Sequence, residues 1–184
     1  MTQKGFYFDM TACIGCKTCQ IACKDKNDLK VGVLYRKVSS FEGGKFPKPW
    51  MYHLSMSCNH CAKPKCVENC PTGALYKRAD GIVAQDIEKC IGCKYCIWSC
   101  PYGAPQYKED QGKVGKCDMC ADLLDKGENP ACVDACVMRV IQYGELDELK
   151  QKYQGTQDLA VLPESNITKP SVLINAKPVA EKGA

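Results

Sequence analysis

Long apolar runs are missing from this chain of 184 residues. No run of about 18 apolar residues occurs, so we expect no segment that spans a membrane. The N-terminal stretch MTQKGFYFD has neither the apolar core nor the small-residue cleavage site of a secretory signal. We therefore also expect no signal peptide on this chain.

Groups that support acid–base catalysis at neutral pH are scarce. His53 and His60 are the two histidines, and histidine is the side chain whose ordinary pKa lies closest to neutrality. No glycine-rich phosphate loop follows a strand-like run. The segment CNHC at residues 58–61 lacks the histidine that follows the second cysteine in a haem c motif. We therefore expect no catalytic residue on this chain.

Blocks of like charge are also lacking. The 25 Lys and Arg and the 21 Asp and Glu give a formal net charge of +4, but the basic residues are scattered along the chain. Cysteines bound to metal as thiolates would make the net charge negative, so the basic balance does not indicate a nucleic-acid partner.

Cysteine is the residue that the chain has in excess. The apolar fraction of 45 % includes 16 cysteines, so the other apolar residues are few for an ordinary core. Without a secretory signal, eight disulfides are disfavoured, because disulfides persist in oxidising compartments. The sequence favours reduced cysteines that hold metal.

The cysteines fall into four groups of four. The first and third groups have the spacing C-x₂-C-x₂-C-x₃-C of bacterial ferredoxins; the second widens one gap and the fourth contains a longer loop. The last cysteine of such a run binds the neighbouring cluster in two-cluster ferredoxins, so we expect ligands to be exchanged between paired groups. Spacing alone leaves open which groups pair. The groups are Cys13, Cys16, Cys19, Cys23; Cys58, Cys61, Cys66, Cys70; Cys90, Cys93, Cys96, Cys100; and Cys117, Cys120, Cys132, Cys136.

Two other uses of these cysteines are less well supported. Disulfides within a group would be strained, because three cysteines lie so close together in the chain. Four Cys₄ zinc sites would make the protein a zinc-stabilised interaction module. Zinc ribbons, however, pair two C-x₂-C knuckles and do not need the fourth cysteine with the proline that follows it, Pro71 or Pro101. The spacing therefore favours four [4Fe–4S] clusters.

The sequence around the groups is repeated. CIGCK occurs at residues 13–17 and again at residues 90–94, each time four residues after an aspartate. Strand-like runs precede these repeats at residues 6–8 and 82–84, and others follow the second and fourth groups within residues 71–76 and 137–144. Residues 146–150 are helix-like.

With these groups, the chain resembles the four-cluster ferredoxin subunits of molybdopterin oxidoreductases, and within them the iron–sulfur subunits of anaerobic dimethyl sulfoxide reductases. The resemblance covers nearly the whole chain and is most specific at residues 18–25, 54–61 and 100–107 and in the tail at residues 162–163 and 168–170. Val137 stands where the family usually has proline, and Leu123 where it often has arginine. Neither is a ligand position, so the resemblance implies four [4Fe–4S] clusters.

The resemblance also implies that the first group pairs with the fourth and the second with the third. The ligand sets would be Cys13, Cys16, Cys19 and Cys136; Cys117, Cys120, Cys132 and Cys23; Cys58, Cys61, Cys66 and Cys100; and Cys90, Cys93, Cys96 and Cys70.

The expected fold class is α+β, with two interleaved ferredoxin-like halves that each hold two [4Fe–4S] clusters. One half would combine residues 1–23 with residues 108–144, and the other would be residues 58–107. Residues 24–57 would be an insertion and residues 145–184 a C-terminal extension. We expect both of these segments to lie on subunit interfaces, with ordinary surface loops as the alternative.

The resemblance implies an electron-transfer subunit of anaerobic respiration. It would relay electrons from an integral membrane anchor that oxidises quinol to a catalytic subunit with molybdopterin guanine dinucleotide. The same relay in a polysulfide reductase, a thiosulfate reductase or a formate dehydrogenase stays open. The subunit would fold in the cytoplasm and associate with the membrane within a heterotrimer, on the cytoplasmic face or exported with a partner that carries a twin-arginine signal.

Several residues beside the cysteines have two interpretations. Four lysines adjoin ligand positions: Lys17, Lys65, Lys94 and Lys116. Each is either a cation that raises the reduction potential of the nearby cluster or a solvated surface side chain. His60 is expected either to contact a cluster or to be exposed. Trp98 is expected to pack beside the third group rather than to take part in redox chemistry.

Overall fold

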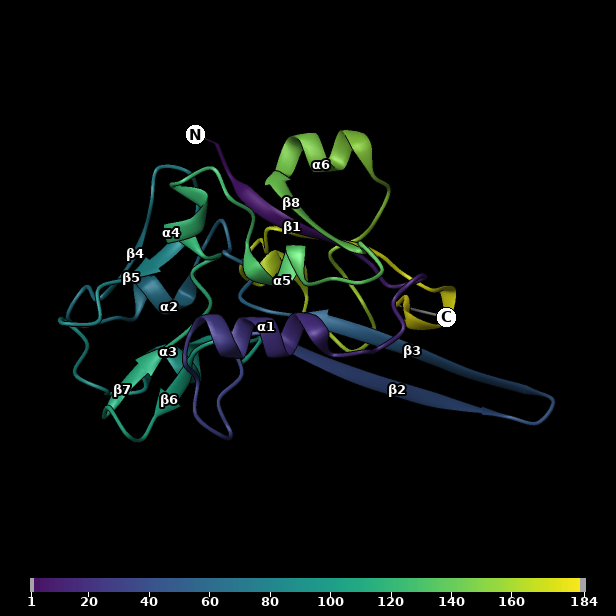
Figure 1. The fold of residues 1–184 in the computed structure, drawn as a ribbon, viewed down its shortest axis with the longest axis horizontal. Helices are drawn as coiled ribbons and strands as arrows, with labels where there is room; N and C mark the ends of the chain where they lie inside the picture. The colour runs from purple at the N-terminus through teal and green to yellow at the C-terminus, as the bar shows by residue number, and fades with distance from the viewer. Residues whose placement is uncertain (1, 183–184) are drawn as a thin grey trace.

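The computed structural model describes residues 2–182. Met1 and residues 183–184, which belong to the first predicted half and the predicted extension, lie outside the described residues. Within residues 2–182, the strands form one three-stranded sheet and three two-stranded hairpins, with short helices between them (Figure 1). This arrangement confirms the predicted α+β fold class.

The strands are β1 (Lys4–Asp9), β2 (Lys37–Lys45), β3 (Lys48–Met56), β4 (Leu75–Lys77), β5 (Val83–Gln85), β6 (Gln106–Lys108), β7 (Lys113–Gly115), β8 (Ile141–Glu145) and β9 (Val172–Asn175). The helices are α1 (Thr18–Lys26), α2 (Lys65–Glu68), α3 (Tyr95–Ser99), α4 (Ala121–Leu124), α5 (Ala131–Asp134) and α6 (Leu146–Lys152), with 3₁₀ turns η1 (Ser165–Ile167) and η2 (Pro178–Ala180).

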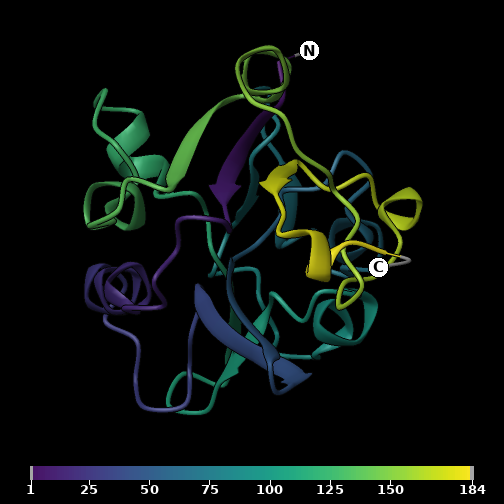
Figure 2. The same ribbon diagram turned by 90° about the vertical axis from the view of Figure 1, so that its right-hand side faces the viewer.

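The three-stranded sheet joins the two ends of the chain. Its central strand β1 pairs antiparallel with β8 and parallel with β9, and Figure 2 shows the purple β1 between the yellow-green β8 and the yellow β9. Side chains alternate between the two faces of a strand. Phe6 and Phe8 accordingly enter the main core, whereas Tyr7 stacks on Tyr153 with 4.0 Å between the ring centroids. Both faces of β1 are therefore covered.

The repeated CIGCK sequence folds twice in the same way. Gly15 and Gly92 both have a φ of +68°, and the lysines that end the repeats have φ of +62° and +64° immediately before α1 and α3 begin. A positive φ is easily reached by glycine. α1 then packs against α5, and α2 against α3.

The strand-like runs of the sequence are found in the structure. Residues 6–8 lie in β1, and two of the three residues of the run 82–84 lie in β5. β4 begins within residues 71–76 and β8 within residues 137–144, and each ends one residue beyond its stretch. The helix-like stretch at residues 146–150 lies in α6. These local predictions are confirmed.

A long hairpin formed by β2 and β3 projects from the body of the molecule (Figure 1). The sequence predicts an insertion here but does not predict its strands. Val38 and Leu54 are buried at the base of the hairpin, whereas Phe46 at its tip is 96 % exposed. The hairpin is thus held at one end and free at the other.

The buried interior combines cysteines with aliphatic and aromatic side chains. Phe8, Met10 and Ile141 belong to a core cluster that also contains Cys19, Cys132 and Cys136. No helix within residues 2–182 is both long enough and apolar enough to cross a bilayer.

Candidate metal centres

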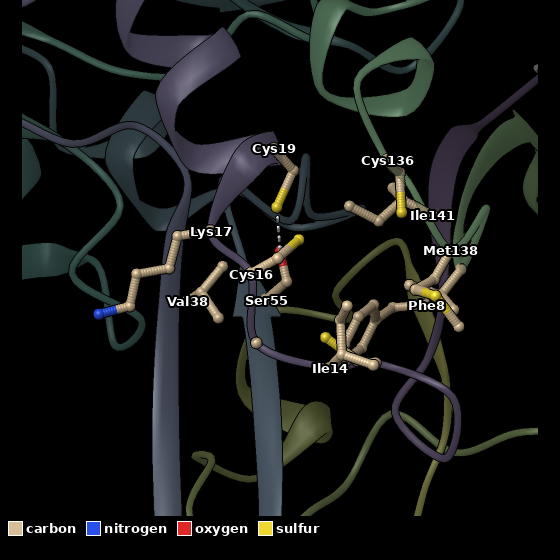
Figure 3. A pocket seen from close by; sticks show the side chains of 13 residues that line it. Phe8, Ile14, Cys16, Lys17, Cys19, Val38, Ser55, Cys136, Met138 and Ile141 are labelled. Atoms are coloured by element: carbon tan, nitrogen blue, oxygen red, sulfur yellow. Dashed lines mark hydrogen bonds between the residues drawn. The ribbon is translucent and has the colours of Figure 1, made fainter.

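Four cysteines from two distant segments line one cavity (Figure 3). Cys13 and Cys16 precede α1, Cys19 lies in its first turn, and Cys136 follows α5. The hydroxyl of Thr18 donates a hydrogen bond to the Sγ atom of Cys16 at 3.3 Å, which lowers the pKa of Cys16. The cavity therefore presents four thiols among apolar walls, with a hydrogen-bond donor at a sulfur.

Two further cavities are each lined by four cysteines. Cys58, Cys61, Cys66 and Cys100 line one, and Cys70, Cys90, Cys93 and Cys96 line the other. Burial, followed by neighbouring thiolates, raises the pKa of Cys66 to about 12 and that of Cys96 to about 11. Burial raises the pKa of Cys100, and the backbone N–H groups of residues 102–104 act to lower it.

The last four cysteines are buried together. Cys23 lies in α1 one helical turn after Cys19, so this helix presents cysteines to two different sets. Burial raises the pKa of Cys23 to about 12, and the negative charges of Cys132 and Cys120 add to the effect. The pKa of Cys117 is raised well above its ordinary value by burial and by the charge of Cys23. Cys23, Cys117, Cys120 and Cys132 thus form a fourth set.

These sets fit iron–sulfur cubes by the chemistry of their donors. Each set supplies four thiol sulfurs, which suits a [4Fe–4S] cube with one cysteine for each iron. The hydrogen bond to the sulfur of Cys16 is of the kind that tunes such clusters. Within residues 2–182, no three groups of metal-binding type lie close enough to hold a single ion. Three of the sets line cavities and so surround a space rather than a point.

His60 lies between two of the sets and is fully buried. Its Nδ1 atom accepts a hydrogen bond from the backbone N–H of Val83 at 3.1 Å, and its Nε2 atom lies 3.9 Å from the Sγ atom of Cys117. Burial and the positive charge of Lys116 hold its pKa well below the ordinary value. Of the two interpretations of His60, exposure is wrong.

Lys116 is the buried member of the four lysines beside ligand positions. It is 5 % exposed, and its Nζ atom donates to the carbonyl oxygens of Val83 and Cys117. Lys17 and Lys94 end the CIGCK repeats, and the Nζ atom of Lys94 lies 3.9 Å from the centre of the Tyr107 ring. Lys116 is therefore a buried cation beside the fourth set.

Trp98 lies on the surface beside the third group. Its side chain is 74 % exposed and packs edge-on against Tyr95, with 5.7 Å between the ring centroids. It does not line the cavity that contains Cys93 and Cys96. The reason is that the short helix α3 turns its buried cysteine inward and leaves Trp98 on the outer side.

Two buried polar residues, Arg36 and Ser55, are not predicted by the sequence. Arg36 is 2 % exposed and Ser55 is 3 % exposed. Arg36 immediately precedes β2, and Ser55 lies in the opposite strand β3. The sequence signal is one arginine at the start of a strand, which by itself predicts an exposed side chain.

Exposed apolar side chains lie beside two of the sets. Ile14 and Met138 are exposed and line the cavity of Cys16, and Ile21 and Val137 are exposed in the same segments of the chain. Ile91 is exposed and lines the cavity of Cys93, and Tyr95 and Trp98 are exposed in α3, which carries Cys96. Such apolar rims are typical of surfaces that contact other proteins.

Comparisons with known proteins extend along almost the whole chain. Two families described as 4Fe–4S dicluster domain match residues 49–146 and 12–74. The chain is similar to the B subunit of anaerobic dimethyl sulfoxide reductase of Escherichia coli (strain K12), at 43 % identity over 98 % of this chain and 94 % of the relative. The protein of the same name from Haemophilus influenzae is 44 % identical over 95 % of this chain and 89 % of the relative. A formate dehydrogenase iron–sulfur subunit of Wolinella succinogenes is 36 % identical over 78 % of this chain and 82 % of the relative.

Proposed function

Because the chain belongs to the family of 4Fe–4S dicluster iron–sulfur subunits that includes the B subunit of anaerobic dimethyl sulfoxide reductase, we propose that it is the electron-transfer subunit of an anaerobic dimethyl sulfoxide reductase. The chain carries four [4Fe–4S] clusters. The observation that carries the proposal is similarity over nearly the full length of that B subunit, which includes the hairpin and the tail as well as the cysteines.

The ligand assignment is part of this proposal. Three sets of four cysteines line three cavities, and the mutual effects of the other four on their pKa values support a fourth set. The four ligand sets are Cys13, Cys16, Cys19 and Cys136; Cys23, Cys117, Cys120 and Cys132; Cys58, Cys61, Cys66 and Cys100; and Cys70, Cys90, Cys93 and Cys96. The division into residues 1–23 with 108–144 and residues 58–107 follows from this exchange of ligands.

The residues of this chain hold and insulate the clusters. When bound, the clusters supply one-electron chemistry whose potential depends on charge, hydrogen bonds to sulfur and solvent exposure. Buried side chains such as Phe8 and Ile141 form an apolar wall of the first set's cavity. The hydroxyl donor at Cys16 stabilises negative charge on its sulfur.

No substrate chemistry is assigned to this chain. His60 is buried, with one ring nitrogen bonded to Val83 and the other close to Cys117. His53 makes a hydrogen bond with Ser40 through its Nδ1 atom at 2.9 Å on the hairpin. Both histidines thus have structural partners, which supports a subunit that passes electrons to a catalytic partner.

The two apolar rims support a partner at each end of the relay. We assign the rim of the first set, with Ile14 and Met138, to a catalytic subunit with molybdopterin guanine dinucleotide. The rim of the third group, with Ile91 and Trp98, would face an integral membrane anchor that oxidises quinol. The complex would be membrane-associated, with this subunit folded in the cytoplasm and then kept there or exported with a twin-arginine partner.

Purification of the tagged chain from anaerobically grown cells tests the function. We expect a molybdenum-containing subunit and a membrane subunit to copurify, and the complex to reduce dimethyl sulfoxide with a quinol analogue as donor. Oxidation of formate, or reduction of polysulfide or thiosulfate, without sulfoxide reduction would overturn the sulfoxide reductase assignment and leave an electron relay of a different complex.

A further inference from the structure

Arg36 is a buried cation held by neutral partners. One terminal nitrogen of its guanidinium, NH1, donates to the Oγ atom of Ser55 at 3.1 Å, and the other, NH2, donates to the Oγ atom of Ser57 at 3.0 Å. The guanidinium carbon lies 4.8 Å from the centre of the Phe6 ring. Its Nε atom is buried and has no hydrogen-bond partner within residues 2–182.

The charge of Arg36 is not balanced by a carboxylate within residues 2–182. Within residues 2–182 the ion pairs of the chain do not include Arg36. Burial acts to lower the pKa of Arg36, but the negative charges of four cysteines outweigh burial and raise it. These cysteines are Cys132, Cys117, Cys19 and Cys23.

The four cysteines belong to two sets. Cys19 lies in the set with Cys13, Cys16 and Cys136, whereas the other three lie in the set with Cys120. A buried charge is costly unless an opposite charge balances it. Arg36 is therefore placed to be balanced by two anionic centres at once.

Arg36 acts on both of these sets, on one of them through a hydrogen-bond path. A guanidinium can only donate hydrogen bonds, so the Ser55 oxygen accepts from Arg36, which leaves the Ser55 hydroxyl hydrogen free to point towards Cys19. The Oγ atom of Ser55 lies 3.5 Å from the Sγ atom of Cys19. On the other side, burial raises the pKa of Cys23, and both the charge and the backbone N–H of Arg36 act to lower it.

We propose that Arg36 is a positioning residue that raises the reduction potentials of the two clusters held by Cys19 and Cys23, through its buried charge and through Ser55. The inference rests on the ligand assignment of the proposed function. Each added electron makes a cluster more negative, and a fixed cation nearby favours that form. Because Arg36 lies close to cysteines of both sets, its charge acts on both clusters.

The test is a redox titration followed by electron paramagnetic resonance on the full-length chain with its clusters. The variants are Arg36→Gln, which removes the charge, Arg36→Lys, which keeps it, and Ser55→Ala. Arg78→Gln is the matched control, because Arg78 is bonded to Asp125 and its charge is already balanced on the surface. Iron content is measured for every variant.

We expect Arg36→Gln to lower two of the four potentials by at least a tenfold change in the reduction equilibrium, about 59 mV for one electron. In Arg36→Lys, both potentials should stay close to their wild-type values. Ser55→Ala should lower one of the two potentials, and Arg78→Gln should change none of the four. Four unchanged potentials in iron-replete Arg36→Gln would overturn the proposal. So would an equal fall in Arg36→Lys, or loss of iron from both Arg36 variants, because these indicate a purely structural role.

The wild-type protein separates the two levels of the proposal. A wild-type chain that lacks four reducible iron–sulfur centres contradicts the proposed function itself. A wild-type chain with four such centres, combined with unchanged potentials in the Arg36 variants, contradicts only the role of Arg36.

Discussion

The Nε2 atom of His60 lies 3.9 Å from the Sγ atom of Cys117, although the two residues are 57 positions apart in the chain. The Nδ1 atom of the same ring accepts the backbone N–H of Val83, so the single proton of the neutral ring is on Nε2 and faces the sulfur. His60 itself lies between Cys58 and Cys61. The ring therefore connects two cysteine sets.

Two substitutions, His60→Asn and His60→Gln, should separate the two contacts of the ring. The shorter amide of His60→Asn keeps an acceptor near Val83 but does not reach Cys117. The cluster held by Cys117 should then become harder to reduce, by roughly threefold to tenfold in its reduction equilibrium, the value of one hydrogen bond. A redox titration of the full-length chain with its clusters measures this change.

His60→Gln should behave in the opposite way. Its amide reaches towards Cys117 but leaves the buried N–H of Val83 without an acceptor, at a cost of about 1–3 kcal/mol in stability. The thermal loss of visible cluster absorption reports this cost, and the redox titration is repeated on the same variant. Equal potentials and equal stabilities in the two variants would contradict the roles given to the two nitrogens.

Gly92 and Gly73 form a matched pair for a test of the CIGCK turn. Both have positive φ, of +68° and +64°, but a Cβ atom on Gly92 would collide with the backbone oxygen of Gly112, whereas nothing lies within 4 Å of one on Gly73. Gly73→Ala should cost about 1 kcal/mol, the penalty of the left-handed conformation. Gly92→Ala should cost more stability and should also lower the iron content of the protein, because the cluster held by Cys90 and Cys93 would bind less well. Equal iron content and stability would show that the contact with Gly112 does not matter.

The hairpin of β2 and β3 provides a test of the partner proposal. Phe46 at its tip is 96 % exposed, so Phe46→Ser should change the stability of the isolated chain by no more than about 0.5 kcal/mol. It should nevertheless reduce the amount of complex recovered, and backbone amides of residues 37–56 should exchange more slowly in the complex than in the isolated chain. Tyr76→Ser, at a half-exposed position on β4, is the control. Unchanged recovery and unchanged exchange would place the hairpin outside the interface.

Removal of iron should unfold the chain. Burial raises the pKa of Cys23 and Cys66 to about 12, so without metal these sulfurs would be neutral thiols at pH 7. No metal cluster would then hold the cysteines of a set together. Metal binding supplies folding free energy in such proteins. Circular dichroism after anaerobic chelation should therefore show loss of the strand and helix signal to which β1, β8 and the short helices contribute. A native spectrum in the iron-free protein would contradict this dependence.

The local elements are predictable from the sequence because they depend on neighbouring residues. The run at residues 6–8 suits a strand, and the two CIGCK repeats form the same turn at Gly15 and Gly92. The β2–β3 hairpin is not predictable in this way, because its polar and glycine-containing first strand has no clear alternation. Its base is held in place by Val38 and Leu54 in the core, a contact that no local pattern reports.

Residues that act across the chain are less predictable. Arg36 and Ser55 gain their significance only when the hairpin brings them beside Cys19. The position of Trp98 between cysteines suggests an interior residue, but the orientation of α3 leaves it exposed. Spacing indicates an exchange of ligands, whereas the choice of paired groups depends on the family resemblance.

The metal content and redox behaviour of the anaerobically purified full-length chain test the presence of the four clusters most directly. We predict about 16 iron and about 16 sulfide per chain, which is four cubes, and four centres that become visible by electron paramagnetic resonance as the protein is reduced. Four zinc ions with no sulfide, or a colourless protein that stays silent after reduction despite ample iron during expression, would contradict this prediction.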